Sequence, residues 1–175
     1  MYFNVCILVN QTNNETDHQC ADKASEVILK FDHNLETAPY KRYLDAEEVA
    51  SMSKHYQTAE PQELAAKLED WDGEPGGVDD QGLYVLSTQN PEGKFDRGDL
   101  IDLIPRDQWE HVFLSGKDDL MSRAVITPDG KWHDEWDLMK EGLEGEERLN
   151  EWERQVKILF ETYTDATAFL ASLHS

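Results

Sequence analysis

The chain has 175 residues, 39% of them hydrophobic and 10% aromatic, and its 37 acidic against 16 basic residues give a formal net charge of −21. This length suits one domain that can bury a core of useful size. A surface of this charge repels DNA, RNA and anionic membranes, so we expect no direct binding to nucleic acid or membrane. Basic proteins or cations are the favoured partners.

The cysteines and the N-terminus predict a cytoplasmic protein. A secreted domain of this size usually carries more cysteines than Cys6 and Cys20, which favours a reducing compartment. Cys6 lies inside the apolar run 5–9, where we expect it to be buried and unreactive. That run is far shorter than the roughly 20 residues of a membrane-spanning helix, and no Lys or Arg precedes it as in a signal peptide.

Residues 2–9 predict the first strand of a sheet. Alternate residues from Val5 to Val9 are expected to share one face, while Phe3 and Leu8 help to cover the other. Because both faces carry apolar side chains, this strand is expected to lie inside the fold.

Helices are predicted for much of the next part of the chain. Apolar residues at helical spacing predict a helix over 18–31, and residues 33–44 are expected to be extended. Asp45-Ala-Glu-Glu48 resembles a capping box that opens a second helix. A third helix is predicted over 61–71 with its proline in the first turn, and the glycine-rich acidic stretch 72–80 is expected to be a loop.

The second half of the chain predicts further strands. Residues 82–88 predict a strand that we expect in the same sheet as residues 2–9. A hairpin is predicted over 123–133 around Pro128-Asp129-Gly130. The short segments 100–104 and 109–114 stay open between strand and helix.

The clearest helix of the sequence lies near the C-terminus, over residues 145–163. Its apolar residues recur at i, i+3, i+7, i+10 and i+14: Leu149, Trp152, Val156, Leu159 and Tyr163. Residues 168–173 are expected to form a final strand. Together these patterns predict an α+β fold with a single domain over 1–175, in which a mixed or antiparallel sheet is covered by helices including this long amphipathic one.

No pattern predicts catalytic residues, a metal site or a cofactor. The six histidines are dispersed, and the chain contains no HExxH, CxxC or G-x-S-x-G motif and no phosphate-binding loop. Asp96, Asp99 and Asp102 recur every three residues but lack the alternate acids and terminal Glu of a calcium loop, so we expect an ordinary surface loop. An enzyme of unknown class stays open as the third hypothesis.

Trp132 and Trp136 lie in a charged setting around His133. Two interpretations stay open: exposed tryptophans that contact a partner, or side chains that cap the core beside the hairpin.

The negative charge is concentrated in two stretches. Residues 45–80 contain eleven acids and two bases, and residues 134–153 contain nine acids and two bases, so together they hold −16 of the −21. We expect the partner-binding surface here, on acids that flank or occupy glycine-containing segments. These candidate partner-binding residues are Glu69, Asp70, Asp72, Glu74, Asp79, Asp80, Glu141, Glu144, Glu146 and Glu147.

Several segments together resemble one protein group. They are Phe31-Asp-His-Asn-Leu-Glu, Ser87-Thr-Gln-Asn-Pro-Glu-Gly-Lys-Phe-Asp96, Val125-Ile-Thr-Pro-Asp-Gly-Lys-Trp-His133 and the end near Leu173-His174. The chain is similar in these to uncharacterised proteins encoded by bacteriophages and prophages, which share Asn-Pro-x-x-Lys-Trp-Asp and Thr-Pro-Asp-Gly-Lys-Trp-His signatures. Asp96 is followed here by Arg-Gly-Asp-Leu-Ile-Asp, where that group has aromatics and a Gly-Gly-Arg-Trp segment. The resemblance implies a phage context and no mechanism.

Charge and context together favour an inhibitor as the leading hypothesis. An array of carboxylates can imitate DNA phosphates and occupy the basic groove of a host nuclease, restriction enzyme or CRISPR effector in the host cytoplasm. The alternative from another class is a phage accessory protein of other role, whose acidic surface serves solubility.

Overall fold

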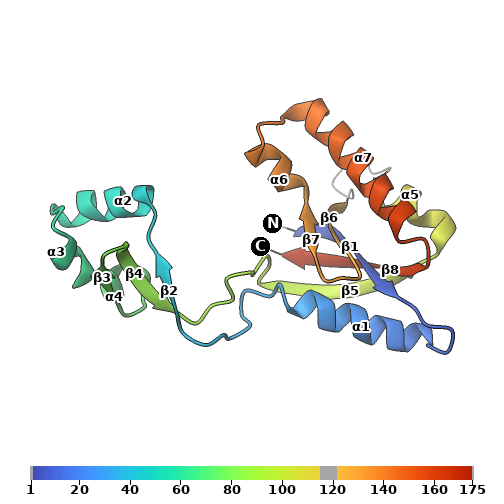
Figure 1. Cartoon of the computed structure of the whole chain (residues 1–175), viewed down its shortest axis with the longest axis horizontal. Coiled ribbons are helices and arrows are strands. Elements are labelled where there is room, and N and C mark those ends of the chain that lie inside the picture. The colour runs from blue at the N-terminus through green and yellow to red at the C-terminus, as the bar shows by residue number, and fades with distance from the viewer. Residues whose placement is uncertain (1, 115–121, 175) are drawn as a thin grey trace. The chain divides into compact units, whose positions relative to one another are not determined.

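The computed structural model describes residues 2–114 and 122–174, and the chain forms two compact units. The main unit combines Met1–Leu35 with Pro91–Ser175, and the inserted unit is Glu36–Asn90 (Figure 1). A single domain over 1–175 stays a prediction. Each unit has its own sheet and its own core, so each is described by itself.

The main unit is built on a five-stranded sheet with the order β5-β8-β1-β6-β7. Its strands are β1 (Tyr2–Asn10), β5 (Arg97–Ile104), β6 (Ser122–Ile126), β7 (Trp132–Asp134) and β8 (Ala166–His174). β1 runs parallel to β6, and the other neighbouring strands are antiparallel. The predicted α+β class with a mixed sheet is therefore confirmed, as are the hairpin and the final strand.

Helices cover both faces of this sheet (Figure 1). α1 (Asp17–Leu29) packs on one face, and α7 (Gly145–Thr162) and α5 (Trp109–Leu114) pack on the other. Two shorter elements, η1 (Arg106–Gln108) and α6 (Glu135–Lys140), precede α5 and α7. Segment 109–114, which the sequence left open, is therefore helical, and segment 100–104 belongs to strand β5.

The central position of β1 in the sheet explains why apolar and polar residues do not alternate in its run 5–9. Val5 and Ile7 face the cluster around α1, whereas Cys6 and Leu8 face the cluster around α7, and all four are fully buried. The buried Cys6 is as predicted. Phe3 was assigned to the wrong face: it packs with Val5 on the α1 side, because side chains two apart on a strand share a face.

α7 covers the sheet as its spacing predicts. Trp152 and Val156 are fully buried, and Phe160 contacts Trp109 with ring centroids 5.0 Å apart. Leu149, which the same spacing placed on the buried stripe, is 41% exposed because it lies at the start of the helix beyond the core. No helix among residues 2–114 and 122–174 is long and apolar enough to cross a bilayer.

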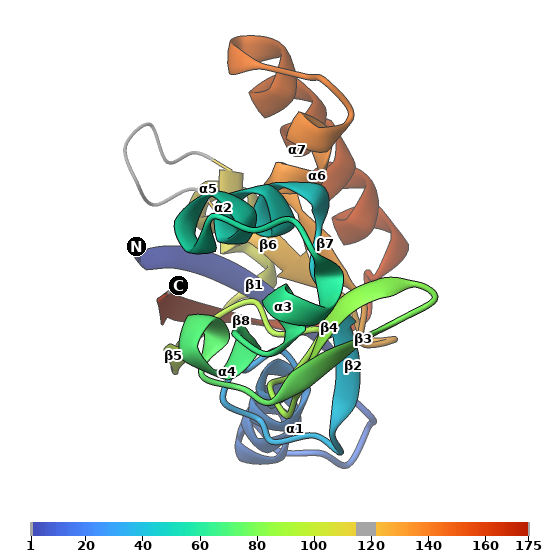
Figure 2. The same cartoon turned by 90° about the vertical axis from the view of Figure 1, so that its left-hand side faces the viewer.

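The inserted unit consists of a three-stranded antiparallel sheet with helices packed against it (Figure 2). Its elements are β2 (Tyr40–Tyr43), α2 (Ala46–Tyr56), α3 (Pro61–Ala65), α4 (Leu68–Asp72), β3 (Gly76–Asp79) and β4 (Gly82–Ser87). Its core joins one buried side chain from each helix to alternate residues of β4: Met52, Leu64, Leu68, Leu83 and Val85. The capping box at Asp45 is confirmed, since its carboxylate accepts from the backbone of Glu47 and Glu48.

Three predictions for this unit are wrong. The strand at 82–88 forms, but it pairs with β2 and β3 and not with the sheet of β1, because the short turn at Asp80 favours the local hairpin with β3. The helix predicted over 61–71 breaks at Ala66 into α3 and α4. The glycine-rich loop contains strand β3, where a Cβ atom on Gly76 would lie 2.2 Å from the Tyr84 carbonyl oxygen, so a glycine is needed for this close pairing.

Candidate functional site

Six predicted partner-binding acids lie in the inserted unit. Glu69 and Asp70 are exposed on α4, Asp72 ends that helix, Glu74 follows it, and Asp79 and Asp80 lie at the β3–β4 turn; this set of six is called the α4–β3 acids. They come from one continuous stretch that turns between a helix and a strand. The structure therefore places these six acids in one unit.

Two of the α4–β3 acids are engaged by their own unit. Arg42 Nη2 lies 3.1 Å from Asp72 Oδ1, while its Nη1 lies 2.8 Å from Glu48 Oε1. Lys41 Nζ lies 2.6 Å from Asp79 Oδ2, which also accepts from the Tyr43 hydroxyl. The hydrogen bond from Lys41 lowers the pKa of Asp79. Asp72 and Asp79 thus hold β2, α4 and β3 together and have little charge left for a partner.

Four predicted acids lie in the main unit. Glu141 ends α6, Glu144 precedes α7, and Glu146 and Glu147 lie in the first turn of α7. Glu146 and Glu147 are stabilised by the dipole of α7, since acids are favoured in the first turn of a helix. Glu146 and Glu147 line an open hollow of about 480 Å³. The two acid sets belong to different units, so they do not constitute one site within a single unit.

Most of the predicted acids keep a free charge. Apart from Asp72 and Asp79, none of the ten forms an ion pair with a residue that the structure describes. All of the remaining eight are exposed except Glu74, which is half-buried. Unpaired carboxylates at this density produce a strongly negative local potential.

A hollow lies beside the α4–β3 acids. It measures about 580 Å³ and has an apolar floor that includes Val49, Leu64 and Leu83. Asp79 and Asp80 belong to its lining. Because Asp79 is paired with Lys41, Asp80 is the one of these two whose carboxylate is free of ion pairs among the described residues.

The segments for which the sequence predicts a resemblance to a phage group meet in the main unit. The backbone of His33 donates to Phe95 O at 2.7 Å, and the side chain of Asn34 donates to Asp96 O at 2.8 Å. Asp96 Oδ1 in turn lies 3.0 Å from His174 Nδ1. Segments from four parts of the sequence therefore converge here, since the ring of Phe31 also lies 5.0 Å from that of Trp132.

A pocket opens next to this convergence. It has a volume of about 220 Å³ and is lined by residues of β1, the segment before β5, β6, β7 and α6: Phe3, Lys94, Arg123, Ala124, Trp132, Asp134 and Trp136. Trp136 is 47% exposed and Trp132 is packed against the core, so the two tryptophans differ and neither interpretation covers both. Sequence reasoning missed two cations of the pocket, Lys94, which belongs to one of the signature segments, and Arg123, which lies two residues before another.

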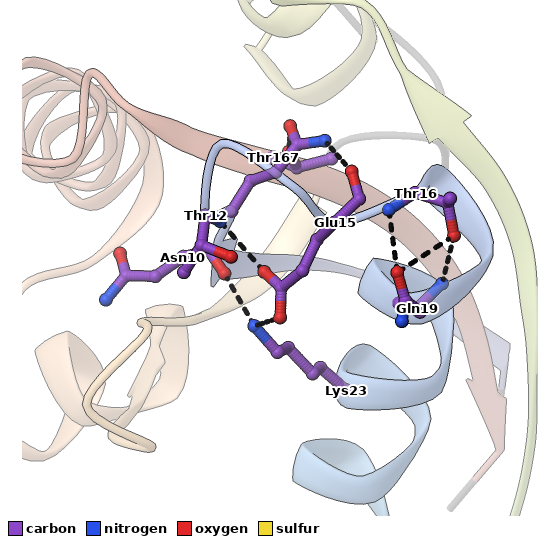
Figure 3. Close-up of polar contacts among 8 residues, drawn as sticks. Asn10, Thr12, Glu15, Thr16, Gln19, Lys23 and Thr167 are labelled. Carbon is purple, nitrogen blue, oxygen red and sulfur yellow. Dashed lines mark hydrogen bonds and ion pairs between the residues drawn. The ribbon is translucent and has the colours of Figure 1, made fainter.

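The best-connected polar cluster, at the end of β1 and the start of α1, is structural (Figure 3). Glu15 accepts from Thr12 N at 2.8 Å and lies 2.5 Å from Lys23 Nζ, which also donates to Asn10 O at 3.2 Å. The hydrogen bond from Lys23 lowers the pKa of Glu15. Burial raises the pKa of the neighbouring Cys20 thiol, which is the reverse of what a nucleophile needs.

The aspartates spaced by three residues do not share a ligand set. Asp99 and Asp102 lie on strand β5, which corrects the expected surface loop, while Asp96 contacts His174. Among residues 2–114 and 122–174, no group of three or more His, Cys, Asp or Glu side chains is placed to hold a metal ion.

Comparison with known proteins gives no relative. No protein-family model, no curated protein and no solved structure matches this chain. The proposals below therefore rest on the geometry and charge of the two units.

Proposed function

We propose that this protein inhibits a basic, nucleic-acid-handling protein of a bacteriophage's host by binding it in the cytoplasm. A nuclease, a restriction enzyme or a CRISPR effector has the required basic groove. The proposal gives the protein a binding role and no reaction of its own.

The observation that supports it is the set of free carboxylates on the inserted unit. Glu69, Asp70, Glu74 and Asp80, called the free α4–β3 acids, form no ion pair with any described residue, although Lys41 and Arg42 pair with acids close by in the same stretch. The unit thus keeps a negative strip that its own cations do not neutralise. Such a strip is attracted to a groove that binds phosphates.

The fold supports the strip on a small packed core. Leu64 and Leu68 anchor α3 and α4 to the sheet, and the pairs from Lys41 and Arg42 fix Asp79 and Asp72, which lie between acids of the strip in the sequence. A preorganised array loses less conformational entropy on binding than a flexible acidic tail. The apolar hollow beside Asp80 adds a place where an apolar side chain of the same partner can be buried.

The experiment is capture of host proteins by the purified protein, followed by competition with DNA for the captured partner. We expect a basic nucleic-acid enzyme whose binding weakens steeply as salt increases. Neutralising the free α4–β3 acids together, as Glu69→Gln, Asp70→Asn, Glu74→Gln and Asp80→Asn, should weaken binding at least about tenfold. Asp72 and Asp79 are left unchanged, because their substitution would disturb the unit itself.

A matched control carries the same change in charge elsewhere. Asp17, Asp22, Glu26 and Asp165 are exposed acids of the main unit. Their neutralisation should leave binding within about twofold, because none of them belongs to the inserted unit that carries the proposed interface. Equal loss in both variants would mean that net charge alone drives the association, and capture of partners that bind no nucleic acid would contradict the proposal.

A further inference from the structure

The pocket of the main unit has aromatic walls. Phe3, Trp132 and Trp136 line it from three different elements. Trp132 is held in place by the ring of Phe31 at 5.0 Å and by a hydrogen bond from its Nε1 to Asp134 Oδ2 at 2.9 Å. Rigid aromatic side chains of this kind offer a flat ring a stacking surface.

The charged groups of the pocket differ in whether their polar atoms are already hydrogen-bonded within the protein. Both carboxylate oxygens of Asp134 accept a hydrogen bond, Oδ2 from Trp132 and Oδ1 from the backbone N of Trp136 at 2.7 Å. Lys94 and Arg123 form no ion pair with any residue that the structure describes, and the Arg123 guanidinium lies 5.8 Å from the Trp136 ring centroid. The free polar groups of the pocket are therefore cationic donors.

Two cations without ion pairs among the described residues line one pocket in a chain of net charge −21. Lys41, Arg42, Lys140 and Arg154 are paired with acids, whereas Lys94 and Arg123 leave their charge to an anion that enters the pocket. An anion that enters the pocket gains charge-assisted hydrogen bonds from Lys94 and Arg123. The surrounding negative surface disfavours a long polyanion, so the anion must be small.

The volume limits the ligand further. A cavity of about 150 Å³ accommodates benzene, and this pocket of about 220 Å³ has room for one ring system with a small substituent. We propose that the pocket binds a small molecule consisting of an aromatic ring joined to one anionic group, either a carboxylate or a phosphate. The ring lies against Trp136 and Trp132, and the anionic group contacts Lys94 and Arg123. This site is separate from the free α4–β3 acids and does not depend on their role.

The test is an NMR titration of the full chain that follows the indole N–H signals of Trp132 and Trp136. Phenyl phosphate and indole-3-acetate are the two probes, and they separate the phosphate from the carboxylate source. Phenol, indole, inorganic phosphate and acetate supply the ring or the charge alone. We expect saturable shifts with at least one aromatic anion below about 10 mM, and at least about tenfold weaker binding of its separate parts.

Variants locate the site. Lys94→Gln, Arg123→Gln and Trp136→Ala should each weaken the binding probe about fivefold or more. The matched controls are Lys54→Gln, Arg97→Gln and Trp71→Ala, which alter exposed residues of the same types outside the pocket. Trp136→Ala keeps the test decisive if Arg123→Gln, on a central strand, fails to fold. No shift with either aromatic anion, equal binding of a separate part, or equal losses in the controls would overturn the proposal.

Discussion

Arg42 Nη2 lies 3.1 Å from Oδ1 of Asp72, so one of the acids that the sequence marks as partner-binding is bound within the inserted unit. The same guanidinium reaches Glu48 on α2. The hydrogen bond that Arg42 donates to Glu48, followed by the one that it donates to Asp72, raises the pKa of Arg42. Arg42 therefore links β2, α2 and the end of α4, and the density of acids along the sequence overstates the charge available to a partner.

The first prediction concerns this link. Asp72→Asn should destabilise the inserted unit because it removes the ion pair with Arg42. The loss should be only about 1 kcal/mol, since solvent screens a half-exposed pair. Glu69→Gln removes no ion pair and should change the stability by less than about 0.5 kcal/mol. Hydrogen exchange of the amides of β2, β3 and β4 measures this locally. Equal protection in the two variants would show that Arg42 contributes no stability through Asp72.

The second prediction tests the packing of α7 on the sheet. Trp152→Ala should cost about 3–5 kcal/mol, because it removes a fully buried ring from the core. Leu149→Ala, on the same helix but 41% exposed, should cost less than about 1 kcal/mol. Urea unfolding followed by circular dichroism gives both values. A small loss for Trp152→Ala would mean that α7 does not cover this face.

The elements with local signals could be predicted from the sequence. The capping box at Asp45, the turn at Pro128-Asp129-Gly130 and the stripe of α7 depend on residues within a few positions of one another. Strand pairing depends on distant residues: Tyr40 pairs with Ser87, and nothing in the spacing of 82–88 distinguishes that partner from β1. For this reason the strand was predicted correctly and its sheet was not.

The candidate sites also combine features with a local sequence signal and contacts between distant residues. The density of acids in residues 45–80 indicated where the α4–β3 acids lie. Which of them are paired depends on Lys41 and Arg42, and these lie on a strand 30 or more positions before Asp72 and Asp79. In the pocket, Phe3 and Arg123 are adjacent because β1 and β6 are neighbours in the sheet. Trp136 follows β7, which pairs with β6, and the backbone of Lys94 is held by a hydrogen bond to Phe31 O. Residues that meet through sheet order leave no spacing pattern in the sequence.

The third prediction concerns acid pH. On α7, Arg154 donates to both oxygens of Glu151, at 2.6 and 2.8 Å, which lowers the pKa of Glu151 from 4.5 to about 2. Because the pKa is depressed in the folded state, the pair stabilises the fold above about pH 4.5, and this contribution is lost as the pH falls towards 2. Carboxyl NMR titration measures the pKa directly. In Arg154→Gln it should rise towards 4.5, and an unchanged value would contradict the assigned cause.

The fourth prediction is a salt dependence of stability. Eight predicted partner-binding acids without ion pairs among the described residues repel their neighbours, and the Debye length grows from about 10 Å at 0.1 M salt to about 30 Å at 0.01 M. The melting temperature should therefore fall as salt is removed, and by a smaller amount in the variant that neutralises the free α4–β3 acids. A melting temperature that is flat or higher at low salt would mean that these charges are balanced within the fold.

The most direct measurement of the proposed inhibitory role is displacement of labelled DNA from the captured host enzyme at about 50 and about 200 mM salt. We predict that the protein displaces the DNA at the lower salt, that its affinity drops steeply at the higher salt, and that the variant lacking the free α4–β3 acids loses most of this salt dependence. Simultaneous binding of DNA and protein, or an unchanged salt dependence in the variant, would contradict the account.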